Sequence, residues 1–504
     1  MSHSLRRLAA AVAVATIASA GGATLLHPTV VHAAGPYVVN DFGDSLDMNP
    51  GDNVCLTTSL TCTLRAAIQE ANADAGPVTI TIPAGTVTLA TAAAGGDDIT
   101  SGDLNITKDL TITGQGPAST TVDAAAIDRA FNVSDGGGGA VPNVTITGMT
   151  VKNGDNSPNL GTPGSGHGGC IYSAGNLTLT NVLVTKCNSA GDGGGVDADY
   201  GTIAADRLTV TVNQARVVGG GLKVGGAPTS AVFTNFTADT NTASSGGGAD
   251  LDGASTFTGA TFTNNTAVGD FGGGVEDDGG STFTNVTITG NSAPNTTAAN
   301  QGGGGLVDFS GGNTTTLLNA TVDGNSVGAG ATGANLAALG NPNTVFSVTN
   351  SIIAGGVGAA DCDRAFTSGG SNINGDNSCG FAASGDLVNT DPKLNKLADN
   401  GGLTKTQLPK AGSPALDAVK NACPPPKADQ IGTARPQGPA CDIGAVEVVV
   451  TSPTSPTATP IPVPATGAAP LPGGSPVGWP VAVVVAGLGL AAVGLTRRRG
   501  SPPV

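Results

Sequence analysis

Acidic residues and one lysine recur at matching positions of a glycine-marked repeat, and they are the residues best placed to do chemistry. The second residue after each glycine cluster forms a first row: Tyr172, Asp197, Lys223, Asp250, Glu276 and Val307. A second row follows two residues later, with Asp277 and Asp308 between the rows: Asp199, Gly225, Asp252, Asp278 and Phe309. If the repeats stack as strands, neighbours in a row lie about 5 Å apart. Carboxyl groups that close can raise the pKa of one of them enough for general acid catalysis.

Three interpretations of the rows stay open from the sequence. Clustered carboxylates could bind Ca²⁺, which takes roughly six to eight oxygen ligands, through Asp197, Asp199, Asp250, Asp252, Glu276 and Asp278. The pattern also resembles the acid clusters on one sheet face of pectate-lyase and polygalacturonase β-helices. That resemblance implies metal-binding or acid–base roles for Asp197, Asp250 and Glu276, and a role as base or charge partner for Lys223. The third interpretation is structural: an outward row is solvated, and acids beside a lysine balance charge.

Composition excludes several other classes of site. Of the four His, His3, His27 and His32 lie in an N-terminal export segment, so a multi-histidine zinc site is not expected. The remaining histidine, His167, is predicted to be a loop residue without a role. One Trp and three Tyr leave few rings for stacking sugars or bases. The net charge of −16 disfavours nucleic acid, because phosphate binding needs clustered Lys and Arg.

The repeats themselves predict the fold. Glycine clusters begin at residues 168, 193, 219, 246, 272 and 303, so successive repeats are 25, 26, 27, 26 and 31 residues long. Between the clusters, apolar residues alternate with Thr or Asn, which is the period of a strand with one face inward. Repeats of this length without a helical pattern indicate an all-β fold, a right-handed parallel β-helix. A β-propeller is less favoured because each blade needs about 40 residues.

An asparagine that recurs at the same turn of each repeat supports stacking of one rung (one turn of the solenoid) on the next. An Asn recurs after the second strand, and it is expected to form a hydrogen-bonded ladder with left-handed backbone geometry: Asn188, Asn213, Asn241, Asn265, Asn291 and Asn325. The glycine clusters are expected at tight bends where a Cβ atom would clash.

The ends of a solenoid must be covered. Residues 63–73 form the one clear amphipathic helical stretch and are predicted to cap the N-terminal end, with Arg65 tying the helix to the first rung through a carboxylate or carbonyls. The segment 391–448 loses the repeat and is predicted to be an irregular C-terminal cap.

Eight cysteines, without the C-x₂-C spacing of zinc sites, favour disulfides in an exported chain. Sequential pairing is the simplest hypothesis: Cys55–Cys62, Cys170–Cys187, Cys362–Cys379 and Cys423–Cys441.

The termini carry targeting signals. Residues 1–33 are typical of a secretory signal, with Arg6 and Arg7 before a short apolar run. At the other end, 19 uncharged residues from 477 to 495 precede three arginines, which predicts a transmembrane helix with the body outside. The Pro-rich linker before it contains a segment that resembles a cell-wall sorting signal, with Val where the pattern has Leu: Val463, Pro464, Ala465, Thr466 and Gly467. A sortase would cut between Thr466 and Gly467; alternatively, the helix itself stays as the anchor.

Two regions resemble known bacterial domains. Residues 53–72, with Cys62-Thr63-Leu64-Arg65-Ala66-Ala67 at their centre, are similar to the CSLREA domain of secreted β-helix proteins, with Thr63 for Ser and Ala66 for Glu. Further segments are similar to the choice-of-anchor Q domain: Asn350–Ala354, Asp391-Pro392, Leu397–Gly402, Ser413–Ala415, Asp417-Ala418 and Cys441–Glu447. Together these resemblances imply a bacterial surface β-helix and no established reaction.

These features predict an exported protein anchored to the membrane or cell wall, with a non-catalytic role in adhesion or envelope structure. Its expected partner is an extracellular polysaccharide or the surface of a host or neighbouring cell. The alternative is a cell-attached polysaccharide lyase or glycoside hydrolase that uses the acidic rows, with Ca²⁺ as the one candidate cofactor. The predicted organisation is a signal at 1–33, an N-terminal cap at 34–82, β-helix repeats at 83–390, a C-terminal cap at 391–448, a linker at 449–476 and an anchor at 477–504.

Overall fold

Alternating apolar and small polar residues form the strands of this protein. In β10 (Asn176–Thr185), Leu177, Leu179, Val182 and Val184 are buried while the residues between them are partly exposed. The computed structural model describes residues 35–449 except 75, 94–97, 138, 140, 157–165, 227–229, 270, 296–297, 299–300, 341–344, 420–422 and 424. The described residues hold one helix, α1 (Leu64–Ala73), and 36 strands.

The strands form three sheets, and each strand pairs in parallel with its equivalent in the next rung, as in β10–β13, β12–β15 and β11–β14. The large sheet has 21 strands: β1 (Tyr37–Val38), β2 (Val78–Thr81), β3 (Gly85–Thr88), β5 (Leu110–Thr113), β6 (Thr120–Asp123), β8 (Asn143–Lys152), β10, β13 (Thr202–Thr211), β16 (Ser230–Thr234), β17 (Thr237–Asp239), β20 (Ser255–Thr258), β21 (Thr261–Thr263), β24 (Thr282–Thr284), β25 (Thr287–Thr289), β28 (Thr314–Leu318), β29 (Thr321–Asp323), β32 (Val345–Thr349), β33 (Ile352–Ala354), β34 (Thr367–Gly370), β35 (Ile373–Asn374) and β36 (Leu387–Val388).

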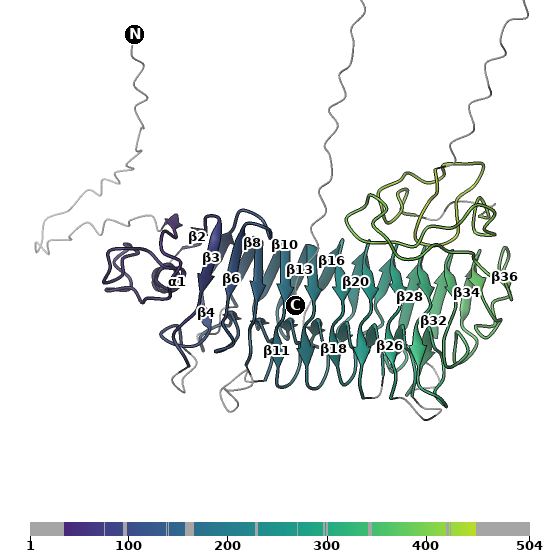
Figure 1. The fold of residues 1–504 in the computed structure, drawn as a ribbon, viewed down its shortest axis with the longest axis horizontal. Coiled ribbons are helices and arrows are strands. Elements are labelled where there is room, and N and C mark those ends of the chain that lie inside the picture. Colours follow the sequence, from purple (N-terminus) through teal and green to yellow (C-terminus); the bar gives the residue numbers. More distant parts are fainter. Residues whose placement is uncertain are drawn as a thin grey trace, which may run out of the picture. The chain divides into compact units, whose positions relative to one another are not determined.

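The nine-stranded sheet carries the acidic rows: β4 (Leu104–Ile106), β7 (Phe131–Val133), β9 (Ile171–Ser173), β12 (Val196–Ala198), β15 (Leu222–Val224), β19 (Ala249–Leu251), β23 (Val275–Asp277), β27 (Leu306–Asp308) and β31 (Leu336–Ala338). The six-stranded sheet lies at a corner: β11 (Asn188–Ser189), β14 (Gln214–Ala215), β18 (Thr242–Ala243), β22 (Thr266–Ala267), β26 (Ser292–Ala293) and β30 (Ser326–Val327). The rungs run from α1 to β36 in Figure 1, so the predicted parallel β-helix is confirmed.

Stacked side chains fill the inside of the solenoid. The rings of Phe233 and Phe257 are stacked at 4.5 Å between centroids, and those of Phe257 and Phe283 at 5.3 Å. The glycine clusters make the bends that bring the sheets together, as predicted: Gly193 has φ +60°, and a Cβ on Gly194 would lie 2.2 Å from the carbonyl oxygen of Gly220. Glycine clusters therefore set where the strands β9, β12, β15, β19, β23 and β27 of the nine-stranded sheet begin.

The predicted asparagine ladder is present, with two corrections. From Asn241 to Asn325, each ladder side chain accepts the backbone N–H of the ladder asparagine one rung before it. At the end of the ladder, Asn335 from the bend before β31 accepts the N–H of Asn325. Asn188 is not a member, because Cys187 takes that position and its N–H donates to Asn213. The left-handed geometry belongs instead to two other rows: one at the bend of the large sheet, which includes Asn235 and Asn285, and one directly before the ladder, which includes Asn264.

Removing one ladder side chain should destabilise the solenoid measurably. The Asn265 amide donates to the carbonyl of Ala238 at 2.9 Å and to Asn291, and it accepts from Asn241, all at fully buried positions. Asn265→Ala leaves these groups unpaired, which we expect to lower the free energy of unfolding by about 2 kcal/mol. Urea titration followed by circular dichroism measures the change. The neighbouring Asn264→Gly is the control, since Asn264 is exposed and glycine accepts its φ of +53°; an equal loss in both variants would contradict the ladder's role.

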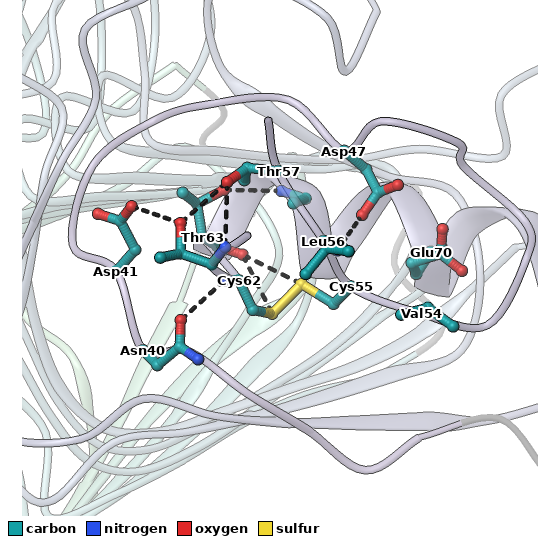
Figure 2. The surroundings of a disulfide bond; sticks show 12 residues. Asn40, Asp41, Asp47, Val54, Cys55, Leu56, Thr57, Cys62, Thr63 and Glu70 are labelled. Atoms are coloured by element: carbon teal, nitrogen blue, oxygen red, sulfur yellow. Dashed lines mark hydrogen bonds between the residues drawn. A yellow bond between two sulfur atoms is a disulfide. The ribbon is translucent and has the colours of Figure 1, made fainter. Parts of the chain in front are cut away.

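The N-terminal cap is built as predicted. Helix α1 begins after Thr63, whose side chain accepts the N–H of Ala66, and its apolar side packs on the first rungs. The disulfide Cys55–Cys62 lies beside this helix start, and Asn40 accepts the N–H of Cys62 at 2.7 Å (Figure 2). All four predicted disulfides are formed. Because such bonds persist in oxidising surroundings, they indicate an exported protein.

The C-terminal segment covers the side of the solenoid, whereas the sequence predicted that it closes the end. Gln430 donates to the carbonyl of Ala260 at 2.9 Å, and Thr261 donates to the carbonyl of Lys405 at 2.6 Å. These contacts place the segment against rungs well before the last one, above β20–β36 in Figure 1. The physical reason is that threonine hydroxyls and carbonyls at the bends of the large sheet offer hydrogen bonds that a polar, irregular segment can satisfy.

Within the part of the chain that the structure describes, no helix has the length and apolarity needed to cross a membrane. The predicted signal at 1–33, the sorting signal at 463–467 and the anchor at 477–504 lie outside the described residues.

Candidate functional site

The predicted first row is confirmed by the strand register of the nine-stranded sheet. Tyr172 pairs with Asp197, Asp197 with Lys223, Lys223 with Asp250, and Asp250 with Glu276. The row becomes apolar after Glu276, where Val307 and Ala337 follow in register. On the other side of Tyr172 the row continues in register through Asn132 and Asn105, so it is polar from β4 to β23 and apolar from β27 on.

The structural interpretation of the row as a solvated face is wrong. Asp197 is 0% exposed, Asp250 3% and Lys223 6%, and Glu276 is partly buried. In the second row, Asp252 and Asp278 are exposed and Asp199 is half-buried. Burial of charged groups is costly unless each is paired, so the contacts made by the first row decide its chemistry.

At one end of the row, His167, Asp197, Asp199 and Tyr172 form what we call the histidine cluster. Nδ1 of His167 lies 3.1 Å from Oδ2 of Asp197 and 3.7 Å from Oδ2 of Asp192. The hydroxyl of Tyr172 hydrogen-bonds to Asp199. The His167 side chain is 37% exposed, while that of Asp197 is fully buried. The cluster thus combines an accessible imidazole with a buried carboxyl behind it.

The charges of the histidine cluster are set by burial and by mutual contact. Burial raises the pKa of Asp197 to about 7, although the hydrogen bond from His167 opposes this rise. The hydrogen bond to Asp197 raises the pKa of His167, against the opposing effect of its burial. Burial also raises the pKa of Tyr172. Around neutral pH, His167 and Asp197 can therefore hold and exchange protons, which is what acid–base chemistry needs, whereas Tyr172 keeps its proton.

A buried arginine holds the histidine cluster in place. Nη1 of Arg129 donates to the carbonyl of His167 at 3.0 Å, and its guanidinium lies 5.5 Å from the centre of the Tyr172 ring. Nε of Arg129 is 2.6 Å from Asp103. Arg129 therefore fixes the backbone of His167 and the ring of Tyr172 together, although it offers no free charge to a substrate.

The rest of the row forms a second group, the lysine cluster, made of Lys223, Asp250 and Glu276. Nζ of Lys223 contacts Oδ1 of Asp250 and lies 2.7 Å from Oδ1 of Asp252. Glu276 hydrogen-bonds to Asp250. These contacts raise the pKa of Lys223 despite its burial, so Lys223 keeps its proton and is a charge partner; the alternative role of a base is disfavoured.

The six acids named as possible Ca²⁺ ligands do not meet at one point. Asp197 and Glu276 are three strands apart in register, which corresponds to about 14 Å. Among the described residues, one group of three can bring ligand atoms within 4.8 Å of one another, namely His167, Asp197 and Asp199. Asp277 and Asp308 are buried, and hydroxyl or backbone donors from Ser281, Thr315 and Ser310 bind them.

His167 lies outside any strand, so the alternation of residues along strands does not predict its contact with Asp197. Its position was nevertheless encoded in the repeat: His167 and Asp192 each directly precede a glycine cluster, and the two residues form a parallel bridge. Extending the alignment one residue before the glycines would have placed the histidine one rung from Asp192.

No protein-family model and no curated protein matches the sequence. Among solved structures, the chain is similar to a pectate lyase, with 15% identity and a TM-score of 0.43 over 82% of this chain and 97% of that one. It is also similar to the A-modules of two mannuronan C-5 epimerases from Azotobacter vinelandii, with 16% identity, TM-scores of 0.37 and 0.38, and coverage of 70% of this chain and 95% of theirs. At this level of identity, the likeness assigns no role to any residue of this chain.

Proposed function

We propose that this protein is an exported enzyme that cleaves linkages of an extracellular polysaccharide by acid–base chemistry at the histidine cluster. The observation that carries the proposal is the 3.1 Å contact between the accessible imidazole of His167 and the fully buried carboxyl of Asp197. A buried carboxyl that orients an imidazole is a recurrent arrangement for proton transfer. The proposal favours the enzymatic alternative over the non-catalytic role that the sequence suggested first.

A long carbohydrate suits the surface around the cluster. The nine-stranded sheet is a straight series of equivalent strands about 4.8 Å apart, so a linear polymer can lie along several rungs at once. Asp252 and Asp278 stand exposed beside the row, where carboxylates can accept hydrogen bonds from sugar hydroxyls. The acidic body, with 16 basic and 37 acidic residues between positions 34 and 467, does not suit nucleic acid.

In this proposal each residue of the cluster has one task. Protonated His167 donates a proton to the leaving glycosidic oxygen, and Asp197 holds the ring and its charge. Asp199, which is hydrogen-bonded to Tyr172, accepts a proton from water in hydrolysis or from the sugar ring in elimination. Both reactions break the same linkage, and the product tells them apart.

The test is a screen of the full chain against acidic and neutral polysaccharides. Release of reducing ends indicates hydrolysis, and ultraviolet absorbance of unsaturated ends indicates elimination. We expect His167→Gln to reduce kcat/KM about 100-fold to 10,000-fold, the usual contribution of a positioned acid or base. Asp206→Asn is the control, because Asp206 lies on the large sheet and its side chain is 42% exposed.

Two outcomes would count against the proposal. If no polysaccharide is cleaved, or if His167→Gln is as active as Asp206→Asn, the cluster is not catalytic. Each assay is repeated with EDTA and with added Ca²⁺, because calcium dependence stays a prediction. Anchoring by residues 477–504 also stays a prediction, which these assays do not address. A surface-adhesion role then remains to be tested by polysaccharide binding alone.

A further inference from the structure

The lysine cluster brings an amine and a carboxyl together in a buried place. Lys223 lies on β15 and Asp250 on β19, directly paired in register, and Nζ of Lys223 contacts Oδ1 of Asp250. The side chains are 8% and 4% exposed. Glu276, on β23, is the next residue of the row and hydrogen-bonds to Asp250. The second carboxylate oxygen of Glu276, Oε2, is buried and has no hydrogen-bond partner among the described residues.

We propose that Lys223 and Asp250 become joined by an intramolecular isopeptide bond, with Glu276 as the residue that transfers the protons. This is a covalent modification of the β-helix itself, linking two successive rungs. It uses none of the residues of the histidine cluster, so its test does not depend on whether the proposed enzymatic function is correct.

The reaction balances without any further reactant. The ammonium of Lys223 and the carboxylate of Asp250 are equivalent, after one proton moves within the pair, to an amine and a carboxylic acid. The amine nitrogen attacks Cγ of Asp250, a C–N bond forms, and the C–O bond to the departing hydroxyl breaks. Glu276 accepts one of the two protons on the attached nitrogen and passes it to that hydroxyl, so one water leaves, the amide keeps its N–H and Glu276 is regenerated.

Three properties of the site favour this condensation. The groups are held in contact by the strand register, which replaces a collision by a fixed geometry. Burial disfavours separated charges, so a neutral amide is a better occupant of this position than an ion pair. Burial and the neighbouring carboxylates also raise the pKa of Glu276, which makes its carboxylate a better acceptor for the proton that leaves the nitrogen.

Another lysine–aspartate pair of the described chain lacks these properties. Nζ of Lys152 is 3.2 Å from Asp123, but their side chains are 33% and 17% exposed. Asp123 takes hydrogen bonds from Ala125 and Asn153, and neither partner is an acid that could move a proton. We therefore expect this pair to remain an ordinary ion pair, and it serves as an internal comparison.

Mass spectrometry and trypsin together test the proposal on the full exported chain. An isopeptide bond removes the mass of one water relative to a variant that cannot form it, and it blocks trypsin at Lys223. Arg216 and Arg364 are the nearest tryptic sites on either side, so the linked form gives one peptide from 217 to 364. A second digestion with thermolysin should release a branched peptide in which Lys223 carries Asp250.

Variants identify the role of each group. Lys223→Arg and Asp250→Ala should give the full mass, with loss of the branched peptide. Glu276→Gln keeps the size of the side chain and should slow linkage about 100-fold or more. Asp252→Asn is the matched control, because it removes the other carboxylate near Nζ and keeps the proposed acceptor. Folding of every variant is checked by its disulfides and circular dichroism.

The proposal is overturned if trypsin cuts the denatured wild type after Lys223 as readily as it cuts after Lys152. Loss of water alone does not support it, because Asp-Gly sequences such as Asp252-Gly253 can also lose water by cyclising. If Glu276→Gln links as fast as the wild type, the bond stands but the role of Glu276 is wrong.

Discussion

Arg65→Ala should lower the stability of the N-terminal cap by about 3–5 kcal/mol, because it leaves a buried carboxylate without its partner. Nε of Arg65 lies 2.7 Å from Oδ1 of Asp44, with side-chain exposures of 0% and 2%. The guanidinium also donates to three carbonyls of the first rung, those of Ile99, Gly102 and Asp103. The Arg65 side chain therefore joins the cap helix both to the segment around Asp44 and to the first rung of the solenoid.

The loss should be local to the cap, since each rung of a solenoid contacts only its neighbours. Hydrogen exchange measured by mass spectrometry should show faster exchange in residues 37–73 and little change beyond β10. Arg207→Ala is the matched control: its ion pair with Asp206 is 44% and 42% exposed and should be worth less than about 1 kcal/mol. Equal effects of the two substitutions would show that Arg65 does not hold the cap helix on the first rung.

The fold and the register of the site could be predicted because both follow from local rules. Glycine clusters mark where strands begin, and the period of two then decides which residues face outward. This is why Asp197, Lys223, Asp250 and Glu276 were correctly placed in one row. The ladder prediction is confirmed for Asn213 to Asn325 for the same reason. It is wrong for Asn188, because the ladder position of that rung is residue 187, which is the disulfide-bonded Cys187.

The burial of the row could not be predicted from the repeat. An alternating pattern says which side of a strand a residue occupies, but not whether neighbouring turns cover that side. The contact of His167 with Asp197 joins a loop to a strand across 30 residues, and the C-terminal segment reaches Ala260 through Gln430 across 170 residues. The first contact joins two side chains, and the second is a hydrogen bond to a backbone carbonyl, which every residue offers. The repeat pattern therefore marks neither contact in advance.

Asp197→Asn should make the protein more stable at pH 8 than the wild type and should have little effect near pH 4. Asp197 has a pKa raised from 3.8 to about 7, chiefly by burial. Below about pH 4, the carboxyl is protonated in both folded and unfolded chains and contributes no pH dependence. Between about pH 4 and 7 the unfolded chain loses this proton while the folded chain keeps it, so rising pH destabilises the fold by on the order of 4 kcal/mol. The raised pKa of His167 acts in the same direction, because its stabilisation is present at low pH and lost as pH rises through its folded value.

Urea titrations of wild type, Asp197→Asn and the exposed-site control Asp206→Asn at pH 4 and pH 8 measure this effect. The expected result is that Asp197→Asn alone is stabilised at pH 8 and that it no longer cleaves polysaccharide. This would show that the fold keeps a destabilising buried carboxyl for its chemistry, as active-site groups commonly cost stability. If Asp197→Asn instead lowers stability equally at both pH values, the carboxyl serves as a structural partner of His167. That outcome would also weaken the proposed reaction, because the proton that His167 and Asp197 share is the one the mechanism uses.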